Sequence, residues 1–333
     1  MKIPEKYMEF TFSSPISECI EKFIAQQRAI GFVFNDQSKH LRSFDRFVST
    51  QNCPPNTLPK ELVNMWIDSR PNEKPTTQRK RANLIKQLGQ FMVKNGYEAY
   101  IPPITVTRAI PPDYIPYIYT NEELARFFTA TDNLPRSSAS NRSLAAPVFF
   151  RMLYGCGLRE SEGRKLRVRD VDLEKGTLAI NATKLGKSRL IPMAPSLLQR
   201  CRDYSRQVHK HSNPDDFFFA PSKGGMYSRG AFLRMFHESL RKAKIPYGGK
   251  GKGPRMHDLR HTFAVHCLRK WSQNSTDITT AFPYLAVYMG HCDLRSSQYY
   301  LRLTSELFEH ITDSLNEQFS DVIPKAGDVY ENN

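Results

Sequence analysis

The sequence predicts a mostly α-helical protein with one small antiparallel β-sheet in its C-terminal half. Apolar residues recur every three or four positions along most of the chain, which is the period of an amphipathic helix. Short alternating segments flank a glycine-containing turn between residues 177 and 193, which indicates a hairpin. The stretch 103–117 is rich in proline, so we expect a semi-rigid linker between two domains.

Four helices are predicted before the linker, in the region 1–102. Each corresponds to an apolar stripe with helical spacing, at residues 16–24, 41–48, 62–67 and 84–92. Around the start of the fourth helix a run of bases contains no acid, which favours a phosphate-contacting face over an ordinary solvated one. The bases of this run that we expect to contact nucleic acid are Arg79, Lys80, Arg81 and Lys86.

The second half begins with a capped helix and then forms the sheet. Thr120, followed by two glutamates in the next three residues, has the pattern of a helix N-cap. A buried helix is predicted at 144–153, and the hairpin strands at 177–182 and 189–193. A further helix is predicted at 229–243, and helices are expected to dominate from there to the C-terminus.

Charge is the most informative feature of the composition. The 333 residues include 48 Lys and Arg against 33 Asp and Glu, a formal net charge of +15. This excess favours a polyanionic partner, because binding phosphates releases counterions; a merely soluble basic protein is the alternative. No apolar run reaches the ~18–20 residues that span a bilayer, and residues 1–10 lack the apolar core of a secretory signal. We therefore expect a soluble intracellular protein whose six scattered cysteines are reduced thiols.

A glycine-rich basic loop is predicted at 248–253. Its sequence GGKGKG is followed by proline, where a phosphate-binding loop requires Lys and then Ser or Thr. We therefore expect Lys250 and Lys252 to contact a phosphate backbone, with an ordinary surface turn as the alternative.

Metal and hydrolase sites are not supported by the residue patterns. His257, His261 and His266 suggest zinc, but Arg260 adjoins His261 and no CxxC spacing completes the site. Residues 157–163 do not match the GxSxG pattern of a nucleophilic serine. We therefore expect no metal and no cofactor.

Four short segments in the second half carry basic and aromatic residues. They are 154–162 with Arg159, 183–192 with Lys184, 257–264 with His257 and Arg260, and 288–291 with His291, nine residues before Tyr300. Each segment alone is unremarkable, but four in this order are far less frequent by chance. Together they resemble the tyrosine recombinase (phage integrase) family, and the resemblance covers the chain from about Tyr119 onward.

The resemblance implies six catalytic residues around one scissile phosphate in DNA: Arg159, Lys184, His257, Arg260, His291 and Tyr300. The two arginines would clamp the non-bridging oxygens, because a guanidinium donates two parallel hydrogen bonds, and His291 would add a third donor.

The resemblance also implies the order of bond changes. Tyr300 would attack the phosphorus while His257 takes the phenol proton, and Lys184 would protonate the departing 5′-oxygen. The product is a 3′-phosphotyrosyl bond, which conserves the energy of the DNA link without metal or ATP. The spacing favours Tyr300 as the nucleophile, with the adjacent Tyr299 packing.

The domain organisation implied is a helical N-terminal region 1–102 that includes the core-binding domain, the linker 103–117, a catalytic domain in 118–303 and an acidic tail in 304–333. Apolar residues recur every four positions from Leu307 to Phe319, so the tail is predicted to contain an amphipathic helix. The resemblance implies that this helix joins subunits of a tetramer on paired double-stranded DNA sites, whereas the residues alone also allow docking on its own domain. The resemblance also allows sister recombinases as further partners but does not require them.

Two features depart from the family pattern. Arg260 and His291 are 31 residues apart, and the extra piece 271–282 is similar to that of transposon-borne integrases. This favours a mobile-element role in a prokaryotic cytoplasm, close to the nucleoid. Glu160 occupies a position that is usually apolar. Two alternatives stay open: a type IB topoisomerase-like nicking-closing enzyme, and a DNA-binding accessory protein with an idle active site.

Overall fold

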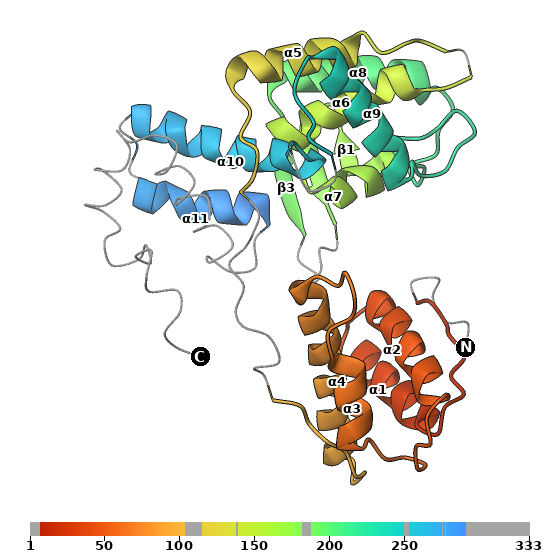
Figure 1. The fold of residues 1–333 in the computed structure, drawn as a ribbon. Coiled ribbons are helices and arrows are strands. Elements are labelled where there is room, and N and C mark those ends of the chain that lie inside the picture. The colour runs from red at the N-terminus through yellow and green to blue at the C-terminus, as the bar shows by residue number, and fades with distance from the viewer. Residues whose placement is uncertain are drawn as a thin grey trace. The chain divides into compact units, whose positions relative to one another are not determined.

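Helices dominate both parts of the chain (Figure 1). The computed structural model describes residues 7–103, 115–137, 139–181, 188–249, 253–274, 276 and 278–290. The chain divides into two compact units, Met1–Asp113 and Tyr114–Asn333. The predicted fold class, mostly α with a small antiparallel sheet, is confirmed.

The first unit contains four helices: α1 Ser17–Ala29, α2 Asn35–Val48, α3 Lys60–Ile67 and α4 Pro75–Lys94. All four predicted apolar stripes are confirmed as the buried faces of these helices. Phe23 and Phe44 are at most 1% exposed, because each faces the other helices of the unit. Pro75 stands in the first turn of α4, where its missing N–H has no intrahelical acceptor to lose.

The second unit is built from seven helices in its described part: α5 Asn121–Asp132, α6 Arg142–Gly155, α7 Glu160–Lys165, α8 Pro195–Val208, α9 Arg229–Lys242, α10 Met256–Gln273 and α11 Ile278–Met289. The predicted N-cap of α5 is confirmed, since the side chains of Thr120 and Glu123 form a reciprocal capping box. A short 3-10 turn, Val168–Asp170, leads into the sheet.

The described sheet has three antiparallel strands: β1 Val171–Asp172, β2 Thr177–Ile180 and β3 Arg189–Pro192, in the order β1-β2-β3. Leu178 pairs with Ile191, so the buried sides of the two longer strands coincide. The predicted hairpin is confirmed, although both strands end earlier than predicted. Strand β1 was not predicted, because two residues are too short for an alternating pattern.

Helix α6 is the centre of the second unit. It packs against α5, α8, α9 and α10, and its Phe149 ring stacks on Phe232 of α9 at 3.6 Å between centroids. Helices α10 and α11 share a smaller apolar cluster that includes Leu268, Leu285 and Met289. The piece 271–282, predicted to be an insertion, contributes the end of α10 and the start of α11 in its described part.

Several predictions concern residues outside the described ranges. These are most of the linker 103–117, the tail 304–333, and the residues Lys184, Lys250, Lys252, His291 and Tyr300. Within the described ranges, no helix is both long enough and apolar enough to cross a membrane. The five cysteines in those ranges are free thiols.

Candidate active site

The C-terminal end of α11 binds three arginine side chains. The carbonyl oxygens of Tyr288, Met289 and Gly290 accept hydrogen bonds from different arginines. The donors are Arg189 Nε at 2.9 Å, Arg260 Nη2 at 2.7 Å and Arg159 Nη2 at 2.7 Å, respectively. The last carbonyls of a helix lack intrahelical partners and carry the negative end of its dipole, so they attract guanidinium groups.

The three arginines come from three different elements. Arg159 is the N-cap residue of α7, Arg260 lies in the second turn of α10, and Arg189 is the first residue of β3. The turn that presents Arg159 depends on Gly157, whose φ of +57° lies in the left-handed region. A Cβ at Gly157 would also come within 2.7 Å of the Phe263 ring.

One carboxylate, that of Glu162, lies among the three guanidinium groups. Its Oε1 is 2.7 Å from Arg159 Nη1, and its Oε2 is 2.8 Å from Arg189 Nη2 and 4.0 Å from Arg260 Nη1. Burial raises the pKa of Glu162, but the hydrogen bonds from Arg189 and from the backbone N–H of Arg159 outweigh it and hold the pKa at about 2. Glu162 is therefore ionised at neutral pH and balances one of the three positive charges.

The two arginines predicted to clamp phosphate differ in exposure. The Arg159 side chain is 32% exposed, whereas that of Arg260 is 1% exposed. Arg260 Nη1 donates to the Gly157 carbonyl at 2.6 Å, so this side chain also ties α10 to the turn that carries Arg159. Arg159 is therefore the guanidinium of this cluster that faces solvent.

His257 lies one turn before Arg260 on the same helix. Desolvation and the positive charges of Arg260 and Arg159 lower the pKa of His257 to about 4. Its ring meets that of His261 edge to face at 4.6 Å. His257 is thus a neutral imidazole near pH 7, and a neutral imidazole can accept a proton.

Arg159, His257 and Arg260 are therefore close together, and three other predicted site residues, Lys184, His291 and Tyr300, lie outside the described ranges. Glu162 and Arg189 were not singled out from the sequence. One signal could have found Glu162, since it follows Arg159 by three residues, the spacing of a capping box.

Glu160, unexpected at its position, has two basic partners. Its carboxylate is 2.5 Å from Arg164 Nε and 3.2 Å from Arg229 Nε. Its presence in the first turn of α7 also complements the helix dipole. A carboxylate is thus accommodated here because two guanidinium groups surround it.

The predicted basic face on α4 needs one correction. Arg79 and Lys80 are exposed and Lys86 is half-buried, but Arg81 is 7% exposed. The Arg81 guanidinium is held by the Glu73 carboxylate at 2.5 Å and packs over the Trp66 ring. Glu73 lies just before the acid-free run, so the sequence pattern hid this ion pair.

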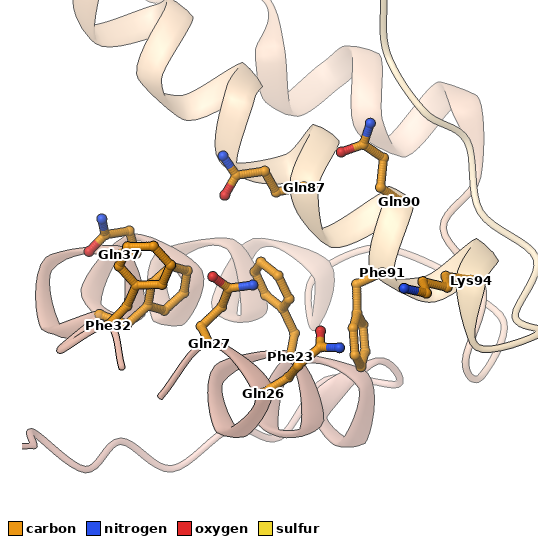
Figure 2. A pocket seen from close by; sticks show the side chains of 10 residues that line it. Phe23, Gln26, Gln27, Phe32, Gln37, Gln87, Gln90, Phe91 and Lys94 are labelled. Atoms are coloured by element: carbon orange, nitrogen blue, oxygen red, sulfur yellow. The ribbon is translucent and has the colours of Figure 1, made fainter. Parts of the chain in front are cut away.

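The remaining exposed side of α4 carries amides. Asn83, Gln87 and Gln90 are exposed at helical spacing, between the basic residues and Lys94. Gln87 and Gln90 also line a groove of about 480 Å³ together with glutamines of α1 and α2 and with phenylalanines that include Phe23 and Phe91 (Figure 2). This side of the first unit presents no acidic side chain along α4.

The three histidines that suggested zinc do not form a ligand set in the described part of the chain. His266 Nδ1 is 3.0 Å from the Tyr154 hydroxyl, whereas His257 and His261 contact each other. No group of three or more His, Cys, Asp or Glu within the described ranges could hold a metal ion.

The comparisons with known proteins give the class of the protein as a tyrosine recombinase. Residues 118–306 match the phage integrase family, and the chain belongs to it. This confirms the membership that the four sequence segments predict.

The protein is similar along most of its length to known relatives. It is 27% identical over 315 residues to y4rB of Sinorhizobium fredii, which is named as a candidate integrase/recombinase; the match covers 92% of this chain and 99% of y4rB. The structure of XerH site-specific recombinase bound to a palindromic difH substrate has a TM-score of 0.60 at 17% identity and covers 82% of this chain and 77% of its own. The Tn1549 transposon integrase with transposon right end DNA has a TM-score of 0.59 at 16% identity, covering 87% and 99%. Both structures share the fold.

Proposed function

We propose that this protein is a site-specific integrase that cleaves and rejoins DNA strands through a 3′-phosphotyrosyl intermediate. The observation that carries the proposal is the convergence of Arg159, Arg189 and Arg260 on Glu162 and on the end of α11. A phosphodiester gains negative charge as it approaches its pentavalent transition state. An excess of fixed positive charge therefore stabilises the transition state more than the ground state.

Arg159 is the residue that we expect to contact the scissile phosphate directly. Within the described ranges, Glu162 and the Gly290 carbonyl accept from its Nη1 and Nη2, each of which carries a second hydrogen. These hydrogens and that of Nε can bind a non-bridging oxygen. Arg260 is buried and contributes positive charge to the site. Its hydrogen bonds to the carbonyls of Gly157 and Met289 hold the backbone on either side of Arg159.

The remaining steps are assigned to residues matched by the family resemblance. The Tyr300 oxygen attacks phosphorus as the bond from phosphorus to the 5′-oxygen breaks, and Lys184 protonates that oxygen. Neutral His257 accepts the phenol proton, and a hydrogen bond from His291 supports the phosphate. No metal or other cofactor takes part in this scheme, and a free 5′-hydroxyl can reverse it by attacking the phosphotyrosine.

The first unit is proposed to bind DNA through the exposed side of α4, as one arm of a two-domain clamp. Arg79, Lys80 and Lys86 would contact phosphates, and Lys250 and Lys252 would do so from the second unit. The amides of Asn83, Gln87 and Gln90 have the chemistry that pairs with adenine edges in the major groove.

The assembly is proposed to be a tetramer on paired double-stranded sites, linked through the tail 304–333 and able to include sister recombinases. A mobile-element role in the cytoplasm of a prokaryote is part of the proposal, and the similarity to a transposon integrase is consistent with the mobile-element role. Each of these assignments requires that the protein cleaves DNA by forming a covalent bond to the cut strand.

The experiment that tests the proposal uses a DNA substrate with a nick beside the cleavage point, so that a cut fragment diffuses away and traps the intermediate. We expect a covalent protein–DNA adduct with the natural chain and none with Tyr300→Phe. Failure of the natural chain to form the adduct on DNA that it binds would favour an accessory protein. Relaxation of supercoils without exchange between two sites would favour the topoisomerase-like alternative.

A further inference from the structure

We propose that Arg189 is a positioning residue of the active site, which keeps the guanidinium of Arg159 directed at the scissile phosphate by hydrogen-bonding both carboxylate oxygens of Glu162. The inference rests on the proposed function and assigns a role to a residue that the six-residue catalytic set does not include. Three observations support the inference: the hydrogen bonds of Arg189, the contact of Arg189 with Gly290, and the Glu162 carboxylate that Arg189 shares with Arg159.

The hydrogen bonds of Arg189 all point into the protein. Nη1 and Nη2 face Glu162 Oε1 and Oε2 at 3.2 and 2.8 Å, and Nε donates to the Tyr288 carbonyl at 2.9 Å. Its side chain is 10% exposed. Arg189 therefore binds Glu162 with a two-pronged pair of hydrogen bonds, and little of its side chain is exposed to a substrate.

Arg159 is bound to the same carboxylate in a different way. Its guanidinium reaches Glu162 through Nη1 alone, at 2.7 Å, and its Nη2 donates instead to the Gly290 carbonyl. A free guanidinium and carboxylate prefer to pair through two parallel bonds. Oε2 of Glu162 already accepts from Arg189 Nη2 at 2.8 Å and from the backbone N–H of Arg159 at 2.9 Å. The guanidinium of Arg159 is therefore limited to one bond to Glu162, at Oε1.

Loss of Arg189 would therefore redirect Arg159. The acceptor position on Oε2 that Arg189 Nη2 now fills would be open to the Arg159 guanidinium. A second side-chain bond there would turn the guanidinium towards Glu162 and away from the phosphate. One of the two excess positive charges of the cluster would be lost as well. Both effects weaken the stabilisation of the transition state, while Arg159 itself remains present.

Arg189 also supports the turn that follows α11. A Cβ on Gly290 would lie 2.5 Å from Arg189 Nη1, so the Gly290 backbone rests directly on this guanidinium. The carbonyl of Gly290 is the second acceptor of Arg159. Arg189 thus contacts both groups that fix the orientation of Arg159.

Arg164 provides a matched control for a purely structural ion pair. Like Arg189, it bonds a glutamate of α7 and a backbone carbonyl, here Glu160 at 2.5 Å and the Tyr227 carbonyl at 3.1 Å. It is 14% exposed. Glu160 has Arg229 as its other partner, so Arg164 is not connected to Arg159 through a shared carboxylate.

The test compares two nicked DNA substrates, one with a normal scissile phosphate and one with a methylphosphonate, in which a neutral methyl replaces one charged oxygen. Because the methylphosphonate has lost this negative charge, its cleavage depends less on a correctly placed guanidinium. The readout is the ratio of single-turnover cleavage rates on the two substrates, which is independent of the fraction of folded protein.

We expect Arg189→Gln to cleave the normal phosphate about 10²-fold more slowly. Its methylphosphonate-to-phosphate ratio should rise at least tenfold above that of the natural chain, as for Arg159→Ala. Arg164→Gln should keep the natural ratio. The double variant Arg159→Ala/Arg189→Gln should be slower than Arg159→Ala alone by much less than the factor that Arg189→Gln costs by itself, because most of that loss acts through the contact of Arg159 with the phosphate.

The inference would be overturned if Arg189→Gln kept the methylphosphonate-to-phosphate ratio of the natural chain. It would also be overturned if the cleavage rate of the double variant fell by the product of the fold-losses of the two single variants. If Arg189→Gln does not fold, Arg189→Lys is measured instead, since it keeps the charge but not the two-pronged geometry. The same rise in ratio is then expected, and a natural ratio overturns the inference. Absence of cleavage by the natural chain would instead contradict the proposed function.

Discussion

The carbonyl oxygen of Gly290 accepts a 2.7 Å hydrogen bond from Nη2 of Arg159, although 131 residues separate the two in sequence. The preceding carbonyls of Met289 and Tyr288 bind Arg260 and Arg189. The end of one helix therefore sets the positions of three guanidinium groups. Helix α11 is itself held by its apolar contacts with α10. The packing of these two helices therefore positions the carbonyl oxygens that bind the arginines.

Gly290→Ala should impair cleavage. The new Cβ would meet the Arg189 guanidinium at 2.5 Å, and the φ of +68° is unfavourable for alanine. We expect the cleavage rate to fall by about 10²-fold and the free energy of unfolding to fall by roughly 1–3 kcal/mol. Gly225→Ala is the control: φ there is +80° but no atom lies within 4 Å, so only the stability should fall. A natural cleavage rate in Gly290→Ala would contradict the arrangement.

Glu162→Gln should lose a pH-dependent part of the stability. The pKa of Glu162 is about 2 in the folded chain against an ordinary value of 4.5, so the unfolded chain binds more protons between these values. The stabilisation is therefore complete above pH 4.5 and is lost as the pH falls towards 2. Urea unfolding at several pH values should show the gap between natural chain and variant closing below pH 4.5. If the difference in free energy of unfolding stayed constant down to pH 2.5, the neighbouring arginines would not stabilise the ionised form of Glu162.

His257 should titrate far below neutral pH in the DNA-free protein. Its folded pKa of about 4 lies under the ordinary 6.5, so its neutral form adds stability that is present above pH 6.5 and lost as the pH falls towards 4. NMR of the imidazole, assigned with His257→Gln, should give a midpoint near pH 4. Arg159→Gln should move this midpoint upward, because one of the repelling charges is gone. A midpoint near 6.5 in the natural chain would argue against a neutral, proton-accepting His257.

Neighbouring bases on α4 should behave differently when they are removed. Lys80→Ala should weaken DNA binding and reduce the slope of log affinity against log salt by about 1, since one phosphate contact is lost. Arg81→Gln should leave that slope unchanged but lower the free energy of unfolding by roughly 3–5 kcal/mol, because Glu73 stays buried without its partner. A reduced salt slope in Arg81→Gln together with an unchanged free energy of unfolding would instead show that Arg81 contacts DNA.

Local patterns predicted most of the fold. The helices of the first unit follow from apolar spacing, and the start of α5 follows from the pairing of Thr120 with Glu123, because both signals lie within a few residues of sequence. The two-residue strand β1 was missed for want of length. Arg81 was misplaced because a run of bases does not show which side chain turns inwards, and its partner Glu73 lies outside the run.

The candidate site was predictable only in part. Arg159, His257 and Arg260 could be matched to family segments, and the membership is confirmed. Arg189 could not be found in this way, because its partners are a carboxylate 27 residues earlier and a backbone carbonyl 99 residues later. Carbonyl oxygens are present at every residue, so no sequence pattern marks the ones that orient a side chain.

The central claim is that an arginine-lined site directs a tyrosine onto a scissile phosphate in DNA. The most direct measurement is to trap the natural chain on nicked DNA, digest it with protease and identify the DNA-linked peptide by mass spectrometry. The account predicts a single link, at Tyr300, that forms far more slowly in Arg159→Ala. A link at Tyr299 or at any other residue, or an adduct that forms equally well without Arg159, would contradict it.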